Sequence, residues 1–474
     1  MKPTVTNNII SLFESTFNEK VADVEVLPLS GSYREYCRLK NNNRTVIGAF
    51  NADIKENEAF FSFTRHFYKN NIPVPKIIAI GEDKTYYLVE DLGNITLFDF
   101  ISQIRQTEGF SEKIVGEYKK VLRQLPKIQI EAGKEIDYSV CYPRAAFDKQ
   151  SMMWDLNYFK YYFLKLAKIH FDEQALEDDF QIFSDYLLTA ASDYFLFRDF
   201  QSRNVMLKDD LVYFIDYQGG RKGALQYDLA SLLYDGKADI PQKIRKYLFG
   251  FYLEELKKLI DVDSEKFKQY FDGFVLIRIM QAMGAYGFRG FYEKKEHFLK
   301  SIPFALNNLK YLLSGLNLPI DIPEMIKVLN GLPQSTVLQE IGASGKGLTV
   351  RVTSFSYKKG IPSDPSGNGG GFVFDCRALH NPGRYEEYKD LTGKDEKVIE
   401  FIETKTEMGE FLNSVQSLIT RSVKKYLERG FTHLTISFGC TGGQHRSVYA
   451  AEKIMEYLQN NFPVEVVLSH REQE

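Results

Sequence analysis

The chain has 474 residues, of which 44% are hydrophobic and 26% charged, and a formal net charge of −3. This length exceeds one ordinary hydrophobic core and predicts two or three domains. The small net charge gives no general nucleic-acid footprint, and four widely spaced cysteines argue against structural zinc and against a disulfide framework. Because no run approaches the ~20 apolar residues of a membrane span and the N-terminus lacks a signal-like apolar core, we expect a cytoplasmic protein without a membrane partner.

The first 90 residues predict a small twisted sheet with one helix. Gly31 and Ser32 lie between the first two strands, where a turn can cover the phosphates of a nucleotide, although a plain hairpin turn explains one glycine as well. Strands are expected at residues 24–27, 36–39, 45–50, 76–80 and 86–90, and the helix at about 54–69.

One segment of the following, mainly helical region carries a distinctive spacing. Phe197-Arg-Asp-Phe-Gln-Ser-Arg-Asn precedes two short strands joined by an Asp-Asp turn, and the second strand ends in Asp216. Asp-x4-Asn followed by a strand-end aspartate is typical of phosphoryl transfer, in which the protein positions a hydroxyl and holds metal ions against nucleotide oxygens. We predict that Asp199 accepts the proton of the attacking hydroxyl, while Asn204 and Asp216 supply oxygen ligands to Mg²⁺ beside ATP.

This segment resembles the aminoglycoside phosphotransferase family, a branch of the protein-kinase-like fold. Phe197 stands where the family commonly has a histidine. The resemblance implies an ATP-dependent kinase of small molecules with a bilobal α+β fold over residues 1–330, hinged at Leu92 and Gly93. It also implies a structural role for Asp228, close to that of an acid that satisfies free N–H groups at a helix start.

One feature of that family is missing from the N-terminal sheet. The strand at 45–50 is apolar and lacks the lysine that contacts the nucleotide phosphates. The run Ser32-Tyr-Arg-Glu-Tyr-Cys-Arg is similar instead to the AmgK-type kinases of N-acetylmuramate and N-acetylglucosamine, which implies an amino-sugar acceptor and cell-wall recycling. Arg34 or Arg38 would then supply the positive charge, unless each is a surface arginine on a strand.

Residues 331–347 predict a linker rich in small and polar residues. Within it, Gly342-Ala-Ser-Gly-Lys superficially suggests a phosphate-binding loop. The spacing does not fit that motif and no strand precedes it, so a flexible linker is the better explanation.

From residue 348 onward, strands alternate with helices. This order predicts a small α/β domain over 348–474 with a parallel sheet and βαβ crossovers. A turn, Cys440-Thr-Gly-Gly-Gln-His-Arg-Ser, falls between a strand and a helix N-terminus, where backbone N–H groups bind anions. Its Cys-x5-Arg spacing is also that of cysteine phosphatases, which is a rival prediction. Strands are expected at 348–355, 371–376, 433–439 and 464–468, and helices at 398–427 and 447–460.

The segments beginning Ser354-Phe-Ser-Tyr, Phe374-Asp-Cys-Arg and Gly439-Cys-Thr-Gly resemble the C-terminal domain of the RNase adapter RapZ. Because that domain senses glucosamine-6-phosphate, the resemblance implies a sugar-phosphate pocket. A strand-end salt bridge is an alternative role for Arg377. The implied pocket residues are Cys440, Thr441, Gly442, His445 and Arg446, with Arg377, Asn381 and Lys359, the last standing where RapZ has a histidine.

Two features of the RapZ family differ here. Its basic tail is missing from residues 470–474, which argues against RNA binding, and its usual N-terminal nucleotide-binding domain is replaced by the kinase-like one. A different class therefore stays open, in which a kinase-like module without strong catalysis serves regulation and the second domain is the sensor. The sequence leaves the oligomeric state open.

Overall fold

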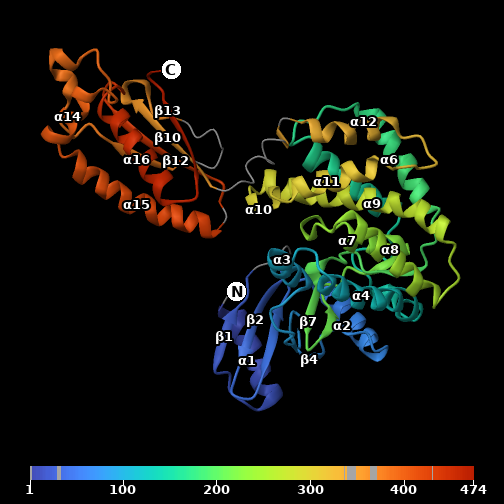
Figure 1. Ribbon diagram of the computed structural model, residues 1–474. Helices are drawn as coiled ribbons and strands as arrows, with labels where there is room; N and C mark the ends of the chain where they lie inside the picture. Colours follow the sequence, from blue (N-terminus) through green and yellow to red (C-terminus); the bar gives the residue numbers. More distant parts are fainter. Residues whose placement is uncertain are drawn as a thin grey trace. The chain divides into compact units, whose positions relative to one another are not determined.

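The computed structural model of the protein describes residues 3–28, 34–335, 337–338, 348–362, 371–429 and 431–473. The elements are shown along the chain in Figure 1. The chain divides into two compact units, residues 1–293 with 301–335, and residues 294–300 with 336–474. Gly31, Ser32 and most of the predicted linker lie outside the described residues.

A five-stranded antiparallel sheet forms the first lobe of the first unit, in the order β1-β2-β3-β5-β4. Helix α1 (Pro3–Phe17), which the sequence did not predict, packs its buried Ile9 and Phe13 against the sheet core. A Cβ at Gly48 would lie 2.3 Å from Ile9 Cγ2, so this glycine lets the helix approach the sheet. The strands are β1 (Asp23–Val26), β2 (Glu35–Lys40), β3 (Thr45–Phe50), β4 (Ile77–Ile80) and β5 (Tyr86–Glu90).

Helix α2 (Ile54–Lys69) follows β3 and carries side chains toward the second lobe. It begins after Asp53, whose carboxylate accepts hydrogen bonds from the backbone N–H groups of Lys55 and Glu56, a regular N-cap. On its buried face, the hydroxyl of Thr64 lies 2.6 Å from the Tyr217 hydroxyl of the second lobe. The helix therefore connects the sheet with the segment that follows Asp216.

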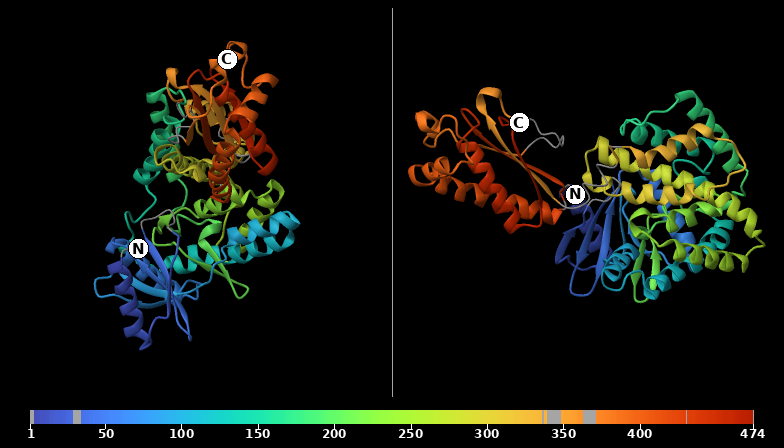
Figure 2. Two further views of the ribbon diagram at one scale, coloured as in Figure 1. Left: turned by 90° about the vertical axis from the view of Figure 1, so that its left-hand side faces the viewer. Right: turned by 45° about the horizontal axis from the view of Figure 1, so that its top comes forward.

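The second lobe is mainly helical and is built around α9 (Ser264–Gly287), which is buried along most of its length. Figure 2 shows the blue strands of the first lobe next to the helices of the second lobe. Helices α5 (Lys149–Phe159) and α7 (Leu225–Leu233) both pack on α9. The other long helices are α3 (Leu97–Glu108), α4 (Glu112–Pro126), α6 (Glu173–Leu188), α8 (Gln242–Lys257), α11 (Ile302–Leu313) and α12 (Pro323–Gly331).

Two short pairs of antiparallel strands carry the distinctive segment of this lobe. Strand β6 (Tyr194–Leu196) pairs with β9 (Arg221–Gly223), and β7 (Val205–Lys208) pairs with β8 (Leu211–Phe214). Asp209 and Asp210 join β7 to β8 with φ values of 53° and 61°. A two-residue hairpin turn with both central residues at positive φ matches the twist of the flanking strands.

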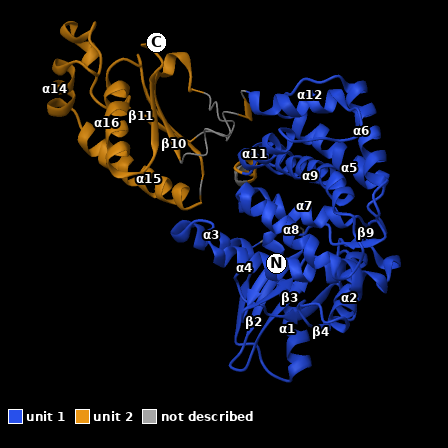
Figure 3. Cartoon of the chain, turned by 45° about the vertical axis from the view of Figure 1, so that its right-hand side comes forward, with its two compact units in different colours: residues 1–293, 301–335 blue, residues 294–300, 336–474 orange. Residues whose placement is uncertain are grey.

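The second unit contains a four-stranded parallel sheet in the order β11-β12-β10-β13 (Figure 3). Its core is formed by apolar residues of the strands and of three helices. Short α10 (Glu296–Leu299) also belongs to this unit. The principal elements are β10 (Thr349–Ser356), β11 (Phe372–Asp375), α14 (Glu396–Lys405), α15 (Met408–Arg429), β12 (His433–Cys440), α16 (Arg446–Asn461) and β13 (Glu465–His470).

The predicted fold class, a bilobal kinase-like α+β domain followed by a small parallel α/β domain, is confirmed. One element prediction is wrong, because the expected helix at 398–427 is two helices. Thr406 is extended between them, and its hydroxyl donates to Ile402 O and accepts the N–H of Met408. Among the described helices, none has both the length and the apolar character needed to cross a bilayer.

Candidate functional site

The loop that carries Asp199 is held in place by a buried carboxylate. Asp228, in the first turn of α7, accepts hydrogen bonds from the backbone N–H groups of Phe197 at 2.8 Å and Arg198 at 3.0 Å. It therefore anchors the residues before Asp199, which agrees with the structural role that the resemblance implies, although the N–H groups it satisfies belong to the loop and not to its own helix. Burial raises the pKa of Asp228 to about 7, although these hydrogen bonds act in the opposite direction.

Asn204 and Asp216 lie side by side next to the Asp199 backbone. The amide nitrogen of Asn204 donates to Asp199 O at 2.8 Å and to Asp216 Oδ2 at 3.2 Å. Gln218 Nε2 holds the other Asp216 oxygen at 2.8 Å. Burial and the charge of Asp199 raise the pKa of Asp216, whose φ of 69° places it in the left-handed region.

This pair fits the requirements of Mg²⁺. With its nitrogen fixed on Asp199 and Asp216, Asn204 turns its amide oxygen the other way, and each oxygen of Asp216 accepts a single hydrogen bond from the side chains above. Mg²⁺ takes hard oxygen ligands and usually keeps few protein ligands beside substrate phosphates. One amide oxygen and one carboxylate satisfy that preference.

The two candidate arginines face different parts of the lobe. Arg34 is 3% exposed and lies 3.4 Å from Glu56 Oε1 of α2. Glu56 Oε1 also accepts a hydrogen bond from Gln218 Nε2 at 3.4 Å. The positive charge of Arg34 favours the ionised form of Asp216, against the larger effect of burial on its pKa. In protein kinases a strand lysine pairs with a helix glutamate; here Arg34 pairs with Glu56 of α2.

Arg38 is instead tied to the hinge. Its guanidinium donates to both Asp91 oxygens, at 2.7 and 3.1 Å, and to Asn94 Oδ1 at 2.6 Å. A further hydrogen bond reaches Gly93 O at 3.2 Å. The charge of Arg38 is therefore paired with the buried carboxylate of Asp91.

Sequence reasoning missed a second group that supports the loop. Arg198, the residue before Asp199, has a φ of 84° and donates to both oxygens of Asp155 on α5, at 2.8 and 2.7 Å. Tyr227 Oη accepts a third hydrogen bond at 2.9 Å. Nothing in the spacing of Asp155 and Arg198 signals this contact, which only the packing of α5 creates.

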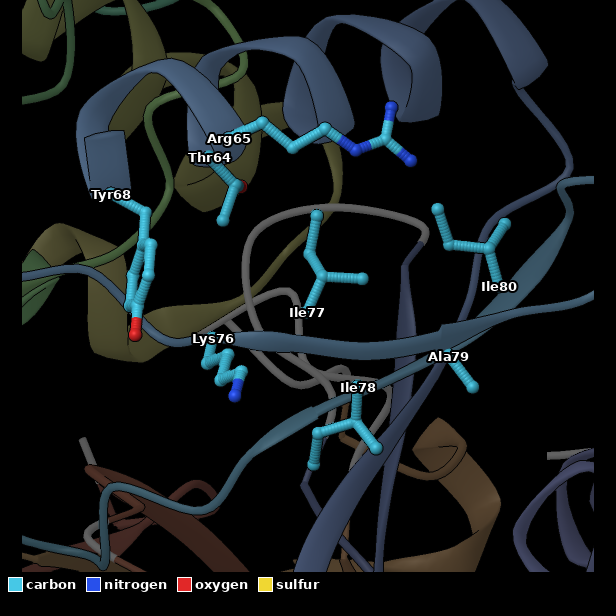
Figure 4. A pocket seen from close by; sticks show the side chains of 8 residues that line it. All are labelled: Thr64, Arg65, Tyr68, Lys76, Ile77, Ile78, Ala79 and Ile80. Carbon is cyan, nitrogen blue, oxygen red and sulfur yellow. The ribbon is translucent and has the colours of Figure 1, made fainter. Parts of the chain in front are cut away.

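A cavity of about 460 Å³ lies between α2 and β4 in the first lobe (Figure 4). Thr64 and Tyr68 extend toward it from the helix, and Ile77 rises from the strand. Arg65 and residues 76–80 complete the lining. Because no residue of the predicted site lines this cavity, it is not the candidate nucleotide site.

In the second unit, the turn after β12 wraps around the Cys440 thiol. Gly443 N–H points at Cys440 Sγ at 3.2 Å, and Ser447 Oγ lies 3.1 Å from the same sulfur. Burial opposes ionisation, but these hydrogen bonds and Arg446 lower the pKa of Cys440. Gly443 has a φ of 70°, and a Cβ on it would lie 2.8 Å from Ser356 N, so the turn requires glycine here, whereas a Cβ on Gly442 would meet open space.

His445 and Arg446 end this turn at the start of α16, and both are buried. Arg446 Nη1 donates to the carbonyl oxygens of Arg377 at 3.0 Å and Leu379 at 2.6 Å, while Nε has no hydrogen-bond partner within the described chain. His445 Nε2 lies 2.8 Å from Tyr388 O. The structure therefore brings together Cys440, His445 and Arg446 with the backbone of the turn.

The remaining predicted pocket residues have other partners. The Arg377 side chain pairs with Asp375 at 2.6 Å, which is the strand-end salt bridge that the sequence left as an alternative. Lys359 pairs with Glu472, and Asn381 Oδ1 accepts the N–H of Gly383 at 3.2 Å. Thr441 is exposed, and its carbonyl accepts a hydrogen bond from Ser356 Oγ at 2.7 Å.

Comparison with known proteins finds a family match within each unit. Residues 32–260 match the phosphotransferase enzyme family, and residues 348–474 match the RapZ C-terminal domain. A nucleotide-binding protein of Fervidobacterium nodosum is 30% identical over 52% of this chain and 86% of its own length. One of Endomicrobium trichonymphae is 38% identical over 32% of this chain and 50% of its own.

The chain spans only about half of the length of several curated relatives that it matches. Solved structures similar to the chain include a choline kinase of Cryptosporidium parvum, at 13% identity and a TM-score of 0.46, covering 69% of this chain and 99% of that one. Choline kinase LicA of Streptococcus pneumoniae has 15% identity and a TM-score of 0.43, covering 64% and 98%. The two family matches show that the chain carries two domains: a phosphotransferase-family domain at residues 32–260 and a RapZ C-terminal domain at residues 348–474.

Proposed function

We propose that the first unit transfers the γ-phosphoryl group of ATP to a hydroxyl of a small molecule, and that this acceptor is an amino sugar. The observation that carries the proposal is the convergence of Asp199, Asn204 and Asp216, joined by hydrogen bonds of 2.8 and 3.2 Å. Positioning and charge stabilisation supply most of the catalysis in such transfers. A compact group of one base and two oxygen ligands is suited to both tasks.

Each residue has a separate role in the proposed reaction. Asp199 accepts the proton of the acceptor hydroxyl as its oxygen attacks the γ-phosphorus. Asn204 and Asp216 hold Mg²⁺, which neutralises charge on the phosphates when it is bound. Arg34 adds a fixed positive charge close to the same carboxylate.

The amino-sugar acceptor is supported by the similarity of the run from Ser32 to Arg38 to the AmgK-type kinases. The structure adds that Arg34, from this run, lies beside Glu56. We further propose that the second unit binds a sugar phosphate such as glucosamine-6-phosphate in the turn formed by residues 440–446. Backbone N–H groups at the start of α16 and the unpartnered Nε of Arg446 favour an anion there.

The variant Asp199→Ala tests the kinase proposal. Removing a general base lowers turnover by about 10² to 10⁴-fold, so ADP release with N-acetylglucosamine or N-acetylmuramate should fall by that factor. Binding of ADP, measured by calorimetry, should persist. Asp185→Ala is the matched control, because Asp185 lies on the exposed side of α6. Equal turnover in both variants would favour a regulatory, non-catalytic unit.

A phosphatase activity of the second unit is the second candidate. The specific observation that favours it is the contact of Ser447 Oγ with Cys440 Sγ, because a stabilised thiolate is the nucleophile of cysteine phosphatases. Hydrolysis of p-nitrophenyl phosphate should then be abolished by Cys440→Ser and retained in Cys376→Ser. Absence of hydrolysis by the unmodified protein removes this candidate.

A further inference from the structure

A second buried arginine lies close to the loop that carries Asp199 and has no carboxylate partner among the described residues. Arg221 begins β9 and stands opposite Leu196, at the end of the strand that leads into the loop. It is 7% exposed. Within the described chain, its one side-chain hydrogen bond runs from Nε to Gly219 O at 3.0 Å, and neither terminal nitrogen donates one.

Its neighbour Arg198, by contrast, is a buried arginine with a carboxylate partner. Arg198 donates to both oxygens of Asp155, and its guanidinium lies over the rings of Phe147 and Tyr227, at 4.9 and 5.4 Å. Asp155 is thus already used by Arg198. Arg221 is left with a carbonyl group as its only hydrogen-bond acceptor among the described residues.

The electrostatic surroundings of Arg221 agree with this geometry. Burial and then the like charge of Arg198 lower the pKa of Arg221, while Tyr227, Asp155 and Asp199 act in the opposite direction. A buried charge without a partner is costly, so such groups are normally paired by an ion from the protein or from a ligand. Arg221 pairs across the strands with Leu196, three residues before Asp199, and this register places it near the residue that is proposed to accept the proton.

We propose that Arg221 binds a carboxylate of the acceptor, so that the preferred acceptor is a sugar acid. The inference rests on the proposed kinase function. With Nε engaged by Gly219 O, the two Nη groups remain as a fork that matches the two oxygens of a carboxylate. A single negative charge neutralises Arg221, whereas a phosphate dianion would add further negative charge beside Asp199 and the transferring phosphoryl group.

Two sugars that differ by a lactyl ether bearing a carboxylate test the subsite by binding alone. N-acetylmuramate carries a lactyl ether with a carboxylate that N-acetylglucosamine lacks. Titration calorimetry on the full chain without ATP should show at least tenfold tighter binding of N-acetylmuramate. Arg221→Gln should remove this preference and leave the affinity for N-acetylglucosamine within threefold, and Arg221→Lys should restore part of it.

Arg245→Gln is the matched control, because Arg245 is also buried but donates to the neutral side chains of Gln242 and Asn308. Its preference for N-acetylmuramate should stay unchanged. Equal binding of the two sugars by the unmodified protein would overturn the subsite, as would an equal loss for both sugars in Arg221→Gln.

ADP release separates the subsite from the kinase proposal. In Arg221→Gln, the KM for N-acetylmuramate should rise at least tenfold, while kcat stays within threefold. Selective binding of N-acetylmuramate without sugar-dependent ADP release would refute the kinase function and leave the subsite supported. ADP release without preference for the carboxylate would refute the subsite and leave the kinase function supported.

Discussion

At the scale of single residues, two arginines of one strand segment have separate tasks. Arg34 lies beside Glu56 and acts on Asp216, whereas Arg38 is held by Asp91 and Asn94. A guanidinium and an ammonium both supply positive charge, but only the guanidinium presents a planar fork to phosphate oxygens. Strand β3 is apolar and carries no lysine, and Arg34 directly precedes β2.

The variants Arg34→Gln and Arg38→Gln should therefore change different quantities, the first the KM for ATP and the second the free energy of unfolding. Loss of a charge-assisted hydrogen bond to phosphate, about 1.5–3 kcal/mol, should raise the KM for ATP by about ten- to hundredfold in Arg34→Gln. In Arg38→Gln, the buried Asp91 loses its partner, which should lower the free energy of unfolding by about 3 kcal/mol while the KM changes little. Steady-state ADP release and urea unfolding measure the two effects. The reverse pattern would assign the phosphate contact to Arg38.

At the scale of elements, the site depends on how α7 meets the strand before the catalytic loop. Asp228 comes from that helix, yet its hydrogen bonds reach the backbone of Phe197 and Arg198. Gln129 Nε2 donates to the same carboxylate at 3.3 Å. The loop geometry is thus set by side chains of neighbouring helices as well as by its own sequence.

Asp228→Asn tests this anchor. An amide offers one acceptor oxygen where the carboxylate offers two, so a backbone N–H is left unpaired and the free energy of unfolding should fall by about 1–3 kcal/mol. ADP release should fall as well, while Asp185→Asn should change neither quantity. An unchanged free energy of unfolding in Asp228→Asn would contradict the anchoring role.

The same residue predicts a dependence on pH. Burial raises the pKa of Asp228 to about 7, so between about pH 4 and 7 the folded protein holds a proton that the unfolded chain has released. The contribution of Asp228 to the free energy of unfolding therefore decreases as the pH rises through this window. Urea unfolding at several pH values should show that decrease in the unmodified protein relative to Asp228→Asn.

Local patterns predicted most elements, but not the contacts between them. Helix α2 agrees with the predicted 54–69 because Asp53 caps it and its apolar residues recur at helical spacing. The break at Thr406 was missed because the apolar periodicity continues across it. Asp155 and Arg221 could not be found, since their roles depend on how α5 and β9 pack beside the loop, and spacing along the chain does not encode that packing.

At the scale of the whole molecule, the two units have separate hydrophobic cores. The parallel sheet of the second unit buries its own apolar residues against α14, α15 and α16, and the first unit is built around α9. Units with independent cores can unfold independently. Each proposed ligand should therefore stabilise one unit alone.

Calorimetry of the full chain should show two unfolding transitions with separate responses. A ligand at about 100 times its Kd stabilises the folded state by about 2.7 kcal/mol, which corresponds to a shift of several degrees. MgADP should shift one transition and glucosamine-6-phosphate the other. Asp216→Asn should remove only the first shift, and Arg446→Gln only the second. If either ligand instead moves both transitions together, its binding energy reaches the other core, and the second unit would then be able to regulate the first.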